Sequence, residues 1–531
     1  MSEPLDAVLE GYLDLRWRLN PVEGTFVGRH DLDDRFGDFR RGAVHDFVVA
    51  LRSYASSLEG AEAATLDDEI DQTAALHSAR HDLLVLEREK PFARDPSFHL
   101  SHALSGLFLL LARPGGDAAR RAAAIVGRLE ALPEFLDSAK EVLTDPRAVF
   151  VQTGQSMIGG SVSLVREGLD EAGVDFVGVD PERLDLARER AVTALLEFGD
   201  LLAEMEETAV DDVAIGRDLF DRKLHTAHMI QENADELLRY GERLREEARA
   251  ELQRWAEVIR PGGSWREVAE VLRHDLPAPE TALAEYEEVM RQAREFTREH
   301  DLMPVPRGEL AVVATPSFLR ALVPFAAYQG PAVFDDDQRG LFFVTLPAPG
   351  EPWRTHCRAE LASTALHEGY PGHHLQIVTA NRLPRLVRRV LSTPVAQEGW
   401  ALYCESLMAE TGFLARPEQR FFQAHHLLWR ALRIVLDVSL HTRGMSVSEA
   451  ARCLREELGF DAASAESEAR RYGAYPTYQL SYAVGRRDIL KLREDAQRAR
   501  GSSFSMRAFH QELLGYGALP IPLARWGMGL A

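Results

Sequence analysis

The residues able to do chemistry in this sequence are concentrated in one short stretch. Residues 361–376 read LASTALHEGYPGHHLQ and contain His367, Glu368, His373 and His374 within eight positions. Neutral imidazole is the commonest protein ligand of zinc, and a glutamate beside a ligand can act as a general base on a water at the metal. The stretch therefore predicts a zinc (Zn²⁺) site with Glu368 as the catalytic base.

The spacing of these histidines requires a break in the helix. In the familiar zinc helix two histidines lie four residues apart, whereas His367 and His373 are six apart. A regular helix turns by about 600° and rises about 9 Å over six residues, so the two rings would point apart. Pro371 and Gly372 favour a break that turns His373 toward the metal. His374 is the alternative second ligand, although on an unbroken helix it would lie about 10 Å along the axis from His367.

A third ligand is expected from a later helix. Residues 395–406 read VAQEGWALYCES, and Glu398 near the start of this segment follows His373 by 25 residues. Glu405 lies two turns later on the same face and is a candidate hydrogen-bond acceptor for a ligand imidazole. An ordinary exposed carboxylate is the alternative role for Glu405.

Hydrolysis also needs groups that stabilise an oxyanion and hold the substrate. Asp437 lies four residues before His441, so on a helix it can fix the tautomer of that imidazole. The candidate oxyanion donors are His441, Tyr475, Tyr478 and Tyr482. The candidate partners for a substrate carboxylate are Arg443, Arg486 and Arg487. For each tyrosine core packing is the alternative, and for each arginine a surface charge.

Most of the chain has the apolar spacing of amphipathic helices, which predicts a large, mainly α protein. The clearest segments are 4–19, 68–90, 117–145, 181–208, 218–259 and most of the chain after 356. Two short β-prone stretches, 309–314 and 340–346, predict a small sheet next to the metal site. A boundary near residue 305 is expected to separate a helical N-terminal part, 1–305, from a metal-binding catalytic part, 306–531. One continuous fold is the alternative.

Charge and hydropathy narrow the partners. The formal net charge is −22, and such a surface repels phosphate backbones, so nucleic acid is not an expected partner. The start lacks the basic and apolar regions of a signal peptide. The longest apolar run, LSGLFLLLA at 104–112, falls well short of the roughly 20 residues that span a bilayer. Three scattered cysteines fit a reducing compartment, so we expect a cytoplasmic protein without a membrane partner.

The blocks HEGYPGHHLQ and QEGWALYCE resemble the bacterial domain of unknown function 885 family, which is regarded as related to zinc peptidases. Further segments fit the family along nearly the whole chain, from GTFVGRHD at 24–31 to AFHQELLGYGALPIPLAR at 508–525. The resemblance implies many helices around a deep central cleft, similar to the helical oligopeptidases. It also implies His367, His373 and Glu398 as metal ligands and Glu368 as base, and Tyr482 matches a family motif position.

These observations predict a zinc-dependent hydrolase of the metallopeptidase type that cleaves amide bonds in short peptides. One alternative is a zinc amidase or tailoring enzyme that acts on a modified small molecule. Another is a non-catalytic metal-binding protein on the same scaffold. Glu368 favours the enzymes, because a merely structural metal site does not need it.

Overall fold

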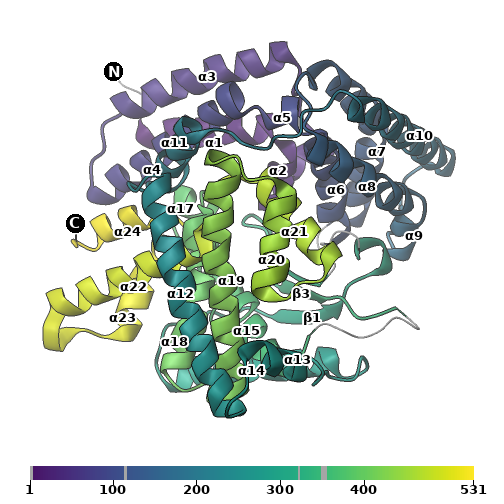
Figure 1. The fold of residues 1–531 in the computed structure, drawn as a ribbon. Coiled ribbons are helices and arrows are strands. Elements are labelled where there is room, and N and C mark those ends of the chain that lie inside the picture. The colour runs from purple at the N-terminus through teal and green to yellow at the C-terminus, as the bar shows by residue number, and fades with distance from the viewer. Residues whose placement is uncertain (1–3, 113–116, 321–322, 324, 349–355, 531) are drawn as a thin grey trace. The chain divides into compact units, whose positions relative to one another are not determined.

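The computed structural model describes residues 4–112, 117–320, 323, 325–348 and 356–530. It confirms the predicted mainly α fold with a small sheet (Figure 1). The chain forms two compact units. Unit 1 contains residues 1–213, 316–322 and 332–337, and unit 2 contains the rest. The predicted division at residue 305 separates a helical part from a metal-binding catalytic part by their expected roles, and it stays a prediction.

Unit 1 is built from helices that each bury one apolar face. In α1 the buried side chains include Val8, Tyr12 and Leu13, at the spacing of one helix face. Thr65 starts α4 with a capping box, which satisfies backbone N–H groups that the helix leaves free. The main helices are α1 (Leu5–Leu19), α2 (Pro21–Val27), α3 (Arg41–Gly60), α4 (Leu66–Leu84), α6 (Pro96–Ala112), α7 (Ala118–Val142), α8 (Ala148–Ser163) and α10 (Pro181–Glu206).

Unit 2 contains the segments in which the sequence concentrates its chemistry. Figure 1 shows α12 lying along α19. The helices of unit 2 are α11 (Arg217–His228), α12 (Ala234–Ile259), α13 (Trp265–Leu272), α14 (Ala282–Glu299), α15 (Arg358–Glu368), α16 (His373–Ala380), α17 (Leu386–Val390), α18 (Pro394–Glu410), α19 (Pro417–Thr442), α20 (Val447–Leu458), α21 (Ala462–Ala474), α22 (Ser481–Arg500), α23 (Met506–Leu514) and α24 (Ile521–Gly527).

One predicted helix is two. The sequence pattern predicted a single helix over 218–259, but α11 ends at His228 and α12 begins at Ala234. Met229 adopts a left-handed conformation, and the side chain of Asn233 caps the first turn of α12. These local signals end one helix and start the next, although the apolar spacing continues on both sides.

The sheet packs directly on the helix that carries the first candidate ligand. Strands β1 (Leu310–Ala314) and β3 (Gly340–Val344) are parallel, and β2 (Ala326–Gln329) pairs with β3 in the antiparallel sense. Buried Phe342 of β3 belongs to the same core cluster as Leu361 and Ala365 of α15. The two predicted strands are confirmed. The pattern missed β2, a four-residue strand with little β-branched character.

Close contact between α18 and α22 depends on glycine. A Cβ atom added at Gly485 would overlap the carbonyl oxygen of Val395, and Gly399 faces the same crossing. The two backbones can therefore approach only because both positions lack a side chain. Glu398 directly precedes Gly399 on α18, and Tyr482 lies three residues before Gly485 on α22, so both residues lie next to this crossing. None of the described helices is both long and apolar enough to cross a membrane.

Candidate metal centre

The predicted break in the histidine segment lies between α15 and α16. Helix α15 ends at Glu368, and α16 begins at His373. Gly372 caps α16 with φ −74° and ψ −132°, and a Cβ atom there would overlap the carbonyl oxygens of Leu366 and His367. The Trp400 indole N–H donates to the carbonyl of Pro371 at 3.0 Å. The absence of a side chain at Gly372 and the hydrogen bond from Trp400 on α18 therefore hold the break in place together.

The break brings three candidate ligands into one group. One donor atom from each of His367, His373 and Glu398 lies within 4.8 Å of the others. The Nε2 atoms of His367 and His373 lie 3.5 and 3.3 Å from Oε2 of Glu398. Two ligands about 2.0–2.1 Å from a tetrahedral ion lie about 3.4 Å apart. The triad therefore has donor types and carboxylate–imidazole separations that suit one metal ion.

A buried carboxylate supports the first histidine. Oε1 of Glu405 lies 2.8 Å from Nδ1 of His367, and Glu405 is 1% exposed, so it is not the ordinary surface carboxylate considered above. The contact orients the ring so that Nε2 faces the other two ligands. Behind Glu405, Nδ1 of His426 lies 3.9 Å from Oε2, and Nε2 of His426 is bonded to Glu360 at 2.6 Å. Sequence reasoning missed both residues: His426 lies on α19, far from the motif in the chain, and Glu360 lies seven residues before His367, just outside the stretch that the histidines mark.

The electrostatics of the triad favour a cation. Burial lowers the pKa of the His367 imidazole, but hydrogen bonds to Glu398 and Glu405 outweigh burial and raise this pKa to about 9. Burial would raise the pKa of Glu398, yet His373 and His367 hold it well below its usual range. The carboxylates therefore stabilise positive charge at the centre, and a metal cation can replace the protons there.

Two tyrosines from the sequence prediction lie at the triad. The hydroxyl of Tyr478 donates to Oε1 of Glu398 at 2.6 Å. The ring of Tyr482 stacks on the ring of His367, with centroids 6.1 Å apart and planes 19° apart. Tyr475, in contrast, is 53% exposed. Tyr478 therefore orients the third ligand, whereas Tyr482 covers the first.

Asp437 positions the turn that carries Tyr478. Its two carboxylate oxygens accept hydrogen bonds from the backbone N–H groups of Thr477 and Leu480, at 3.1 and 3.2 Å. Burial raises the pKa of Asp437 to about 7. His441 is fully buried, with Nε2 3.0 Å from the carbonyl oxygen of Tyr472 and 3.8 Å from Asp437. These contacts hold the turn, and a role for His441 at an oxyanion stays a prediction.

The remaining predicted residues have other contacts. His374 is fully buried, and its Nδ1 lies 2.9 Å from the hydroxyl of Tyr328 on β2, so the metal group contains His373 and not His374. Glu368 ends α15 beside His367 and is half-buried. The three arginines have partners at Asp235 for Arg443, Ser406 for Arg486, and Glu232 and Asp488 for Arg487.

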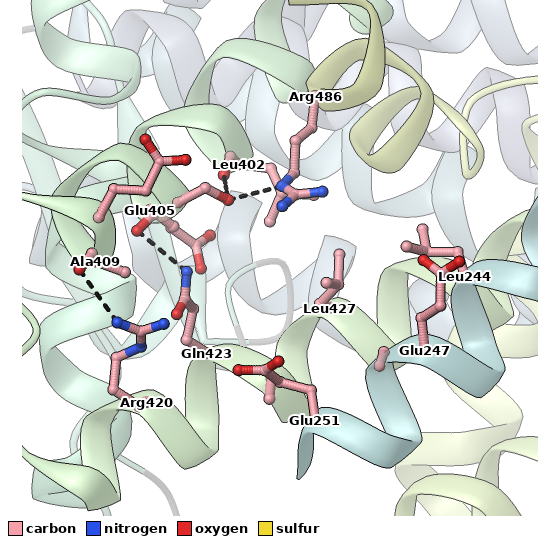
Figure 2. Close-up of a pocket in the computed structure, with 14 residues that line it drawn as sticks. Leu244, Glu247, Glu251, Leu402, Glu405, Ala409, Arg420, Gln423, Leu427 and Arg486 are labelled. Atoms are coloured by element: carbon pink, nitrogen blue, oxygen red, sulfur yellow. Dashed lines mark hydrogen bonds between the residues drawn. The ribbon is translucent and has the colours of Figure 1, made fainter. Parts of the chain in front are cut away.

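A cavity of about 320 Å³ borders the supporting carboxylate (Figure 2). It lies among α12, α18, α19 and α22, and its lining includes Glu405, Gln423 and Arg486. Gln423 donates to the backbone carbonyl of Glu405 at 3.3 Å, and Nε of Arg486 donates to Ser406 at 2.7 Å. The lining contains no member of the metal triad. The cavity therefore adjoins the support of the metal centre and not the ligands themselves.

We expect Glu405→Gln to weaken zinc binding by roughly 10-fold, because the neutral amide loses the charge that holds the His367 ring and its tautomer. Zinc titration against a competing chelator measures the change. Glu410→Gln is the control, because Glu410 lies on the same helix and pairs with Arg493. Equal zinc affinity of Glu405→Gln and the unmodified protein would contradict the role of Glu405.

Comparison with known proteins identifies a family and a fold. The model of the bacterial proteins of unknown function DUF885 matches residues 21–528. No curated protein matches the chain. A solved "putative lipoprotein of unknown function" from Shewanella oneidensis superposes with a TM-score of 0.81 at 20% identity, covering 99% of this chain and 100% of that one. A "putative lipoprotein" from Colwellia psychrerythraea superposes with a TM-score of 0.86 at 17% identity, covering 99% and 98%.

These similar structures correct one prediction. Both are named as lipoproteins, which contradicts the cytoplasmic location predicted from the sequence. The cytoplasmic prediction rests on the first residues, the short apolar run at 104–112 and the sparse cysteines, and it is wrong. We therefore withdraw it. At these identities the likeness to the two structures shows the fold alone.

Proposed function

The chain belongs to the DUF885 family of bacterial proteins, and from the geometry of its triad we propose that it is a zinc-dependent hydrolase that cleaves amide bonds in short peptides. The observation that supports the proposal is the separation of Glu398 Oε2 from the His367 and His373 Nε2 atoms, 3.5 and 3.3 Å, which suits one tetrahedral ion, within a group whose donor atoms lie within 4.8 Å of one another. Two imidazoles and a carboxylate are also a known ligand set of catalytic zinc sites, in which one coordination position stays open.

Bound zinc would supply a Lewis acid that polarises the substrate carbonyl and lowers the pKa of water. Around it, each group of the chain has a proposed task. The carboxylate of Glu368 takes the proton of the attacking water and passes it to the leaving nitrogen. Glu405 accepts a hydrogen bond from Nδ1 of His367, which leaves the lone pair on Nε2 for the metal. Tyr482 or His441 is the proposed donor to the oxyanion.

The proposal extends to the substrate. We propose a short peptide, because the family resemblance implies an enclosing cleft of the kind found in helical oligopeptidases. One fold can carry different substrate specificities, because specificity depends on the side chains of the site. Screening must therefore include substrates of the alternative zinc amidases.

Metal removal tests the proposal. We expect the purified protein to contain about one zinc ion per chain and to hydrolyse members of a short-peptide library. Chelation should lower the rate by at least about 100-fold, and added zinc should restore it. Acylated small molecules assayed in parallel test the amidase alternative. Zinc binding without hydrolysis of any substrate would favour a non-catalytic metal-binding protein, and hydrolysis that survives complete zinc removal would refute the metal mechanism.

A further inference from the structure

Arg430 on α19 is a buried cation that packs over the Trp429 ring, with its Cζ atom 4.9 Å from the ring centroid. It is 8% exposed, and among the described residues its buried Nε and Nη1 atoms have no hydrogen-bond partner. Burial and the neighbouring Arg433 cation lower the pKa of Arg430, whereas the carboxylates of Glu405 and Glu398 raise it from a distance. Proteins rarely bury a charge that is neither paired nor hydrogen-bonded, because desolvation of the charge is costly. The unused donors therefore point to an anion that binds there.

The guanidinium lies beside the candidate metal centre. Its Cζ atom lies 5.7 Å from the centroid of the Tyr482 ring, and that ring stacks on His367 at 6.1 Å. One extended residue spans about 3.3–3.6 Å. Two distances of about 6 Å separate the ring of His367 from the guanidinium of Arg430 by way of Tyr482, and a peptide segment of about three extended residues spans this path.

A neighbouring arginine on the same helix has a hydrogen-bond partner and an ion-pair partner for its guanidinium. Arg433 lies one turn later on α19, with its Cζ atom 4.7 Å from the same Tyr482 centroid. Its Nε donates to the hydroxyl of Tyr472 at 3.1 Å, and its Nη2 pairs with Glu468 at 3.2 Å. The two arginines share a helix and an aromatic neighbour and differ in whether their donors are used. Arg433 is therefore a matched control.

We propose that Arg430 forms an anion-binding subsite beside the metal centre and binds the α-carboxylate of a peptide substrate, so that cleavage removes one to three C-terminal residues. The inference rests on the proposed peptidase function. A carboxylate matches the planar fork of a guanidinium and accepts two parallel hydrogen bonds from it. A carboxylate, with one negative charge, also fits better than a phosphate group, because Glu405 and Glu398 repel a more highly charged anion.

A binding experiment tests the subsite without relying on turnover. The zinc-loaded full chain is titrated by calorimetry with N-acetyl-alanyl-alanine and with the corresponding C-terminal amide. We expect the free acid to bind more tightly. Arg430→Lys should weaken binding of the acid by about 10-fold and Arg430→Met by about 100-fold, with little change for the amide. Arg433→Lys should keep the preference for the acid.

Hydrolysis of paired substrates is the second readout. The ratio of kcat/KM for peptides with a free C-terminus to that for their amides should fall by about 100-fold in Arg430→Met and stay unchanged in Arg433→Lys. An equal loss on acids and amides would overturn the subsite and show that Arg430 only steadies Glu405. If the unmodified protein binds the acid through Arg430 but hydrolyses neither peptide, the subsite stands and the proposed peptidase function fails.

Discussion

Glu368→Gln is expected to lower kcat/KM for peptide hydrolysis by about 10³-fold while the bound zinc stays at one ion per chain. Glu368 is half-buried at the end of α15 and is not one of the three grouped ligands, so the amide should leave the metal site intact. The amide cannot accept a proton at neutral pH, so the transfer from the attacking water is lost. Parallel zinc analysis and steady-state kinetics measure the two effects separately.

Glu360→Gln is the control for this experiment. Glu360 lies on the same helix, and its carboxylate is hydrogen-bonded to His426 and is not one of the three candidate ligands. We expect a loss of less than about 10-fold, because the change reaches the metal only through His426 and Glu405. If Glu368→Gln kept full activity, Glu368 would not be the base. If it lost zinc, its effect on catalysis could not be separated from metal binding.

Gly372→Ala is expected to lower the free energy of unfolding by about 3 kcal/mol and to weaken zinc binding by at least about 100-fold. The added methyl group would overlap the carbonyl oxygens of Leu366 and His367, so the break between α15 and α16 must move. His373 directly follows this break, so its imidazole would leave its position beside Glu398. Thermal unfolding and zinc titration measure the two effects.

Gly42→Ala controls for the loss of a glycine as such. Gly42 lies in α3, and a Cβ atom there has nothing within 4 Å. The substitution should be neutral or stabilise the helix by up to about 1 kcal/mol, with zinc affinity unchanged. A Gly372→Ala protein that binds zinc as tightly as the unmodified chain would show that the break is not what aims His373.

Much of the local structure was predictable from the sequence, because helices and strands repeat at short, fixed spacings. Apolar spacing predicted most of the helices, and β-prone stretches predicted β1 and β3. The Pro371–Gly372 pair predicted the break, since the properties of both residues act on the backbone next to them. Glu398 and Glu405 were predicted from a second motif. They lie seven residues apart, so a helix places both side chains on one face.

Only the tertiary structure decided which of these groups meet. His373 and His374 are neighbours in the sequence, yet one faces Glu398 and the other faces Tyr328. The packing of α15, α18 and α19 creates the series of side-chain contacts from Glu405 through His426 to Glu360. It also buries the Arg430 donors that no described residue satisfies. Backbone preferences act over a few residues, whereas hydrogen bonds, burial and pairing of charges depend on residues far apart in the chain that packing brings together.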